Sequence, residues 1–167
     1  MASTAQILRN HRTELTEYER VEEFLGIISS LGYDTDVEKD NAIYMKPKGC
    51  DDKGVRVWVD QGDHPIFTIN GNDYYREVFF DFVWDDERHG IESMNSDMIL
   101  IIVAEYLKKY PDAYFNYEWS NDDNMFMDII DFDLLRSQPF QPGWFYLFKS
   151  HLHSSRVNEY YDEWRLD

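Results

Sequence analysis

Histidines and carboxylates are the side chains of this sequence that could support acid–base or metal chemistry, and two short groups contain both. His151 and His153 would share one face of a strand, where a neighbouring acid could help them hold a transition metal. Asp85, Asp86 and Glu87 precede a histidine directly after an expected strand, a common position for catalytic groups. Neither group identifies the third ligand and supporting partners that a metal site needs, so a small metal-dependent hydrolase, or another enzyme using Asp, Glu and His clusters, is an alternative interpretation.

Other candidate sites lack a component that their chemistry requires. The acids at 122, 123 and 128 partly match the oxygen spacing of a calcium loop, but the glycine of the sharp turn is missing. Cys50 is followed by two aspartates, which disfavour a reactive thiolate. The sequence also has no phosphate-binding loop, dinucleotide fingerprint, nucleophile elbow or zinc-protease helix. We therefore predict no catalytic residue, no metal ligand and no cofactor.

The charge of the sequence is strongly negative and unevenly distributed. Its 167 residues carry 33 Asp and Glu against 16 Lys and Arg, a formal net charge of −17. Residues 60–135 hold 18 acids and 4 bases, whereas residues 1–59 hold 11 and 8, and residues 136–167 hold 4 of each. Such a charge repels nucleic acids and anionic membranes, so we expect neither as a direct partner.

Between Lys109 and Arg136 there are seven acids and no base, interleaved with aromatic residues. One interpretation is a solvated face that keeps the protein in solution. The other is a docking face for a basic protein surface, in which aromatic anchors add affinity to electrostatic attraction. The predicted partner-binding residues are Asp112, Tyr114, Tyr117, Glu118, Trp119, Asp122, Asp123, Phe126, Asp128, Asp131 and Asp133.

Two helices are predicted from their caps and apolar spacing. Thr16 and Glu19 have the spacing of a capping box at the start of the first, and Gly32 can end it. The second is expected over residues 97–110, with Asn95 or Ser96 as its cap and a proline directly after it.

Alternating apolar residues between these helices predict an antiparallel meander, with Asn70-Gly71 as a tight turn. Its expected strands are residues 34–38, 42–46, 55–60, 66–69, 73–75 and 78–84. Outside the meander we expect a short helix at 5–12, a strand at 113–119 and a helix at 125–135 with Phe126, Ile129, Ile130 and Leu134 inward. A last helix, capped by Ser154 or Ser155, would carry Val157, Tyr160, Tyr161 and Trp164 on one stripe.

Together these elements predict a single α+β domain over residues 1–167. In it an antiparallel β-meander of four or more strands packs with N-terminal, central and C-terminal helices. One cysteine allows no intrachain disulfide, and no apolar run approaches the length of a membrane span. A cytoplasmic location fits both observations.

A short acidic domain of this kind is expected to be a binding protein that docks on and blocks a basic partner. The partner would be a toxin, a nuclease or a nucleic-acid-binding protein, and this chain its inhibitor, a toxin-neutralising immunity-type protein or a mimic of nucleic acid. A scaffold subunit of a larger complex is a third interpretation, in which exposed aromatics form an oligomer interface; a homo-oligomer remains open.

Overall fold

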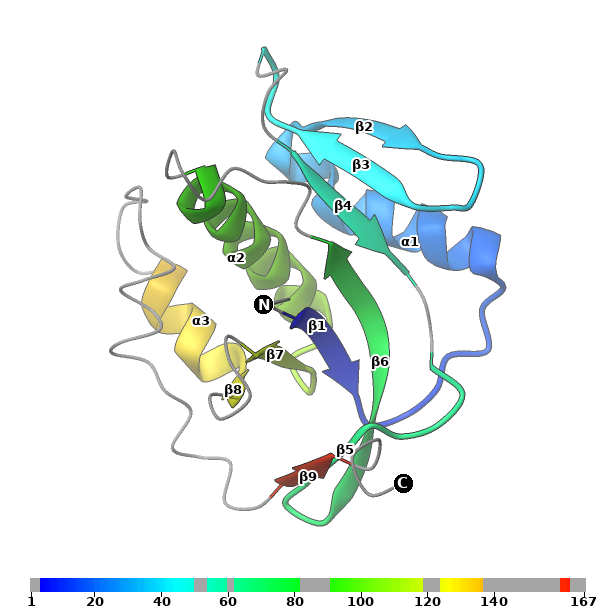
Figure 1. Cartoon of the computed structure of the whole chain (residues 1–167), viewed down its shortest axis with the longest axis vertical. Helices are drawn as coiled ribbons and strands as arrows, with labels where there is room; N and C mark the ends of the chain where they lie inside the picture. Colours follow the sequence, from blue (N-terminus) through cyan, green and yellow to red (C-terminus); the bar gives the residue numbers. More distant parts are fainter. Residues whose placement is uncertain are drawn as a thin grey trace.

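Seven strands lie side by side in the order β2-β3-β4-β6-β1-β7-β8, and every pairing is antiparallel (Figure 1). β5 pairs with the turn end of β6 and with β9. The computed structural model describes residues 4–49, 54–59, 62–81, 91–118, 124–136 and 160–162. In these ranges the strands are β1 (Thr4–Arg9), β2 (Asp34–Val37), β3 (Ile43–Lys46), β4 (Val55–Trp58), β5 (Phe67–Ile69), β6 (Asn72–Asp81), β7 (Tyr114–Glu118), β8 (Asn124–Met127) and β9 (Tyr160–Asp162); the helices are α1 (Glu17–Ile28), α2 (Ile91–Lys109) and α3 (Ile129–Arg136). The predicted α+β class is confirmed.

α1 begins with the predicted capping box. The Thr16 hydroxyl accepts a hydrogen bond from the Glu19 backbone N–H at 3.2 Å, and the Glu19 carboxylate accepts one from the Thr16 backbone N–H. One face of the helix buries Val21, Phe24 and Ile28. After a 3-10 turn over Ser29–Leu31, Gly32 adopts a φ of 70°, the left-handed conformation that ends the segment.

α2 ends where its sequence predicts but begins earlier. It starts at Ile91, so Asn95 and Ser96 lie inside the helix and the predicted N-cap is wrong. The residues before Asn95 are also helical, from Ile91 onward, so the capping preference of Asn95 and Ser96 did not determine where the helix starts. At the other end, Pro111 follows the last turn, in which the Tyr110 N–H donates to the Tyr106 carbonyl.

The predicted meander is present, with one change. Asn70 and Gly71 have φ angles of 51° and 84°, as the tight turn between β5 and β6 requires. The two strands predicted at 73–75 and 78–84 are instead one strand, β6, within the described residues. The pairing of β6 with β1 shifts register between Ile7 and Leu8, and this bulge lets the two strands stay paired along their length.

The predicted helix at 5–12 is wrong, because Thr4–Arg9 form β1 between β6 and β7. Ala5 and Ile7 are buried in the main core, whereas Leu8 is buried in a second cluster. A strand covered on both faces has apolar residues without strict alternation, which a short sequence window does not distinguish from a helix.

Two predictions near the C-terminus are also corrected. The expected helix at 125–135 is strand β8 followed by α3, and Ile130, predicted to point inward, is 52% exposed. Tyr160 and Tyr161 lie in β9, not in a helix, because they pair with β5. The other residues of that predicted helix, including Ser154, lie outside the described residues.

The main core lies between the helices and one face of the sheet. In Figure 1, α1 passes behind β2, β3 and β4; it contacts α2, which in turn contacts α3. A smaller cluster occupies the other face, since neighbouring strand residues such as Phe126 and Met127 belong to different clusters. This second cluster is Leu8, Ile66, Phe67, Ile69, Tyr74 and Phe126.

Candidate functional site

The predicted partner-binding residues that the structure describes fall into three groups: surface residues, core residues and residues that cap α3. The surface group comes first. Asp112 and Asp133 are exposed. Tyr114 is half-buried and packs edge-on against Tyr74, with 5.3 Å between ring centres. Glu118 is the last residue of β7; Trp119, Asp122 and Asp123 lie outside the described residues.

Two of the predicted aromatic anchors are core residues. Tyr117 is fully buried in the main cluster, and Phe126 is 2% exposed in the second cluster. Phe126 packs edge-on against Phe67, with ring centres 5.0 Å apart. The expectation that these two rings contact a partner is therefore corrected: their strands direct them into the protein, where they stabilise the fold.

Asp128 and Asp131 form the N-terminal cap of α3. The Asp128 carboxylate accepts hydrogen bonds from the backbone N–H groups of Ile130 and Asp131, at 3.0 and 3.2 Å. The Asp131 carboxylate, itself only 2% exposed, accepts one from the Asp128 N–H at 3.0 Å. Both acids therefore satisfy the free donors of a helix start, where negative charge is favourable.

α3 presents an apolar residue at the surface. Ile130 and Asp133 are both exposed and lie three residues apart on α3, hence on the same face of the helix. The opposite face buries Phe132 completely. Asp128 was a recognisable capping residue in the sequence, and as a cap it places the helix start at 129.

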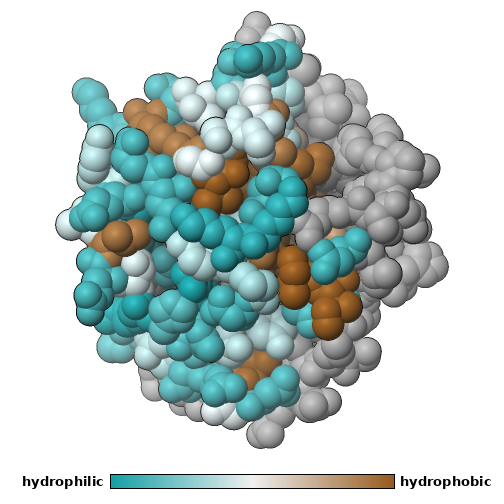
Figure 2. All heavy atoms as spheres, turned by 180° about the vertical axis from the view of Figure 1, so that it is seen from behind, coloured by the Kyte–Doolittle hydropathy of each residue, from teal (hydrophilic) through white to brown (hydrophobic). Residues whose placement is uncertain are grey.

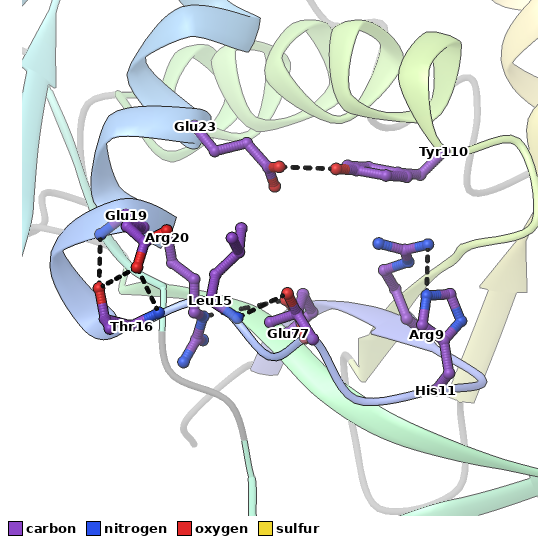
Figure 3. Close-up of polar contacts among 10 residues, drawn as sticks. Arg9, His11, Leu15, Thr16, Glu19, Arg20, Glu23, Glu77 and Tyr110 are labelled. Carbon is purple, nitrogen blue, oxygen red and sulfur yellow. Dashed lines mark hydrogen bonds and ion pairs between the residues drawn. The ribbon is translucent and has the colours of Figure 1, made fainter.

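A buried polar cluster joins α1, β1, β6 and the end of α2 (Figure 3). The Arg20 Nε lies 3.9 Å from the Glu77 Oε1, and only 10% and 7% of these side chains are exposed. Burial raises the pKa of Glu77, because the charged carboxylate loses its hydration, while the charges of Arg20 and Arg9 act in the opposite direction.

Arg9 connects this cluster to the acidic stretch. Its guanidinium carbon lies 3.8 Å from the centre of the Tyr110 ring, and its Nη2 lies 2.9 Å from the His11 Nε2 and 3.7 Å from the Asp112 carboxylate. The Tyr110 hydroxyl donates to the Glu23 carboxylate at 2.8 Å; burial and this bond raise the pKa of Tyr110 to about 12. Arg9 therefore holds Asp112 in place and offsets part of its charge.

Sequence analysis missed this polar cluster because its residues come from distant segments. Glu77 is separated from Arg20 by four strands and their turns, and no motif spacing relates them. The arrangement is a set of charge-assisted contacts that fixes α1 against the sheet. Arg9 and Arg20 lie close to the carboxylates of Asp112 and Glu77, so the cluster brings charges of both signs together.

The structure does not place the predicted metal and enzyme candidates. His151, His153, residues 85–89 and Cys50 lie outside the described residues. Among the residues that are described, no group of three or more His, Cys, Asp or Glu side chains could hold a metal ion. Within the same ranges, no helix is long and apolar enough to cross a membrane.

No protein-family model, no curated protein and no solved structure matches this chain.

Proposed function

We propose that this protein is an acidic binding module that docks on a basic surface of another protein and blocks that surface. The observation that carries the proposal is the uncompensated charge of residues 60–135, with 18 acids and 4 bases. A field of this size attracts a basic partner over distances longer than contact and raises the rate of encounter.

Three described residues could form the contact surface. Asp112 precedes β7 and α3 follows β8, and the pairing of Phe115 with Met127 brings those two ends of the strands together. Asp112, Ile130 and Asp133 are therefore acidic and apolar groups at one end of the β7–β8 pair. Trp119, Asp122 and Asp123, the other predicted contact residues of this group, lie outside the described residues.

Charge is the main feature that supports this proposal, because exposed apolar surface is limited. Figure 2 shows a face on which hydrophilic residues predominate and hydrophobic residues form small, separate patches. Among described residues, the large hydrophobic side chains that are well exposed are Tyr18, Val37 and Ile130. A partner would therefore be recruited by charge and retained by few apolar contacts.

The test begins with the partner itself. The immobilised protein is used to retain proteins from cells of its source, and the retained protein is purified and its association rate measured at several salt concentrations. We expect a partner of positive net charge whose association rate falls at least tenfold as salt rises from about 0.01 to 0.15 M, because the screening length shortens from about 30 to 8 Å.

Variants separate the two contributions to binding. Asp133→Lys should slow association, whereas Ile130→Ala should speed dissociation. The matched control is Glu22→Lys, a single charge reversal at an exposed position of α1. A retained partner without positive charge, or one whose association ignores both salt and Asp133→Lys, would contradict the proposal.

A further inference from the structure

β2 is the outermost strand at one side of the sheet, and it is exposed along its whole length (Figure 1). Within the described residues it pairs with β3 alone. All four of its residues are exposed: Asp34, Thr35, Asp36 and Val37. The apolar side chain of Val37 is 43% exposed to water. A strand edge of this kind can accept a further strand.

The hydrogen-bonding phase of β2 shows which groups its free edge offers. The Glu38 N–H donates to the Ala42 carbonyl at 2.8 Å, at the turn that joins β2 to β3. In an antiparallel pair, successive residues alternate between facing the partner strand and facing away. The backbone N–H and C=O groups of Asp34 and Asp36 therefore point toward β3, whereas those of Thr35 and Val37 point away from the sheet.

The side chains of β2 differ between the two faces of the sheet. Thr35 and Val37 are opposite Met45 and Ile43, which point into the main core, so they lie on the helix side. Asp34 and Asp36 lie on the other side, in register with Lys46 and Tyr44. Glu38 continues this acidic row but is bound to Arg56 at 3.1 Å.

We propose that the free edge of β2 binds an extended basic segment of the partner, which adds to the sheet as a further strand. The inference rests on the proposed function in taking the partner to be basic. Lys or Arg side chains at alternate positions of the added strand would lie directly opposite Asp34 and Asp36, a stabilising cross-strand pairing. The intervening side chains would lie on the side of Val37.

The same acids exclude a second copy of this chain. Pairing β2 with β2 of another molecule would bring the aspartates of both edges onto one face, in chains that each carry a net charge of −17. Acidic residues on an edge strand therefore prevent self-association and select an oppositely charged strand.

The probe is the synthetic peptide Lys-Thr-Lys-Val-Lys-Thr-Lys, with both ends blocked, and the control peptide has Glu in place of every Lys. We expect the basic peptide to bind and to slow hydrogen exchange of the Thr35 and Val37 amides about tenfold or more, while the acidic peptide does neither. Asp34→Lys with Asp36→Lys should abolish binding of the basic peptide.

Two changes test strand addition separately from charge. Val37→Pro removes one outward N–H and no hydrogen bond to β3, so the sheet should tolerate it and peptide affinity should fall about tenfold. A basic peptide N-methylated at alternate residues keeps every charge but cannot pair along that edge, and it should bind the unaltered protein equally weakly. This second probe decides the question if Val37→Pro fails to fold.

The proposal is overturned if the basic peptide does not bind at about 1 mM, or if N-methylation leaves its affinity unchanged. Its failure is distinct from that of the proposed function. A basic partner whose association depends on salt and on Asp133, but not on Asp34, Asp36 or the Val37 amide, would retain the proposed function and exclude the β2 edge.

Discussion

Arg20 of α1 and Glu77 of β6 form an ion pair inside the protein, with 3.9 Å between Nε and Oε1. Both side chains are at least nine-tenths buried, so water screens the pair little. The pair links the first helix to a central strand, and removing either partner leaves the other charge buried.

The first prediction concerns the pH dependence of stability through Glu77. Because burial raises the pKa of Glu77 in the folded protein, its contribution to stability is complete below the unfolded pKa and is lost as the pH rises through the folded value. Glu77→Gln should therefore gain stability relative to the wild type as the pH rises from about 4 to 7, by about 1.4 kcal/mol per unit of upward shift.

Urea unfolding at a series of pH values measures this difference. Glu22→Gln, at an exposed position of α1, is the matched removal of one carboxylate. A difference between Glu77→Gln and the wild type that stays constant with pH would show that the buried carboxylate does not titrate as its environment requires.

The second prediction compares two arginines near the end of β1. Arg9 is 8% exposed and lies over the Tyr110 ring, whereas Arg12 pairs with Asp63 at the surface, with 48% and 86% of those side chains exposed. Arg9→Lys loses the planar stacking group and should cost about 1–3 kcal/mol of folding stability. Arg12→Lys should change it by less than about 0.5 kcal/mol, and equal effects in denaturant unfolding would refute the assigned role of Arg9.

The third prediction uses two neighbouring apolar residues of α3. Phe132 is fully buried and contacts Phe115 edge-on, with 6.1 Å between ring centres, whereas Ile130 is exposed. Phe132→Ala should lower stability by about 3–5 kcal/mol. Ile130→Ala should lower it by less than about 0.5 kcal/mol, which makes it a suitable binding variant. Thermal melting of both variants gives the comparison, and a large loss for Ile130→Ala would place that residue in the core.

Elements determined by local chemistry were predicted well from the sequence. The reciprocal cap of Thr16 and Glu19 and the positive φ angles of Asn70 and Gly71 need only neighbouring residues. β1 and α3 were not predicted correctly, because their form depends on partners far along the chain. Residues 5–8 become a strand through pairing with β6 and β7, and Ile130 faces outward because Phe132 fills the core.

The candidate site was predictable in charge but not in geometry. The excess of acids is a property of composition, so it survives folding unchanged. Which rings are exposed depends instead on which face of its strand each residue occupies, and Tyr117 and Phe126 occupy faces that are covered. The acidic edge of β2 was likewise hidden, since position at the side of a sheet is set by strand order and not by the sequence of the strand.

The central position of β1 also constrains how the chain is made and folded. β1 pairs with residues around Phe80 on one side and around Tyr117 on the other, so its two neighbours emerge from the ribosome long after it does. At 5–20 residues per second, roughly 6–22 s separate synthesis of β1 from that of Glu118. During that time Ile7 and Leu8 have no strand to pair with on the β7 side, so the sheet cannot close around β1 until β7 has been made.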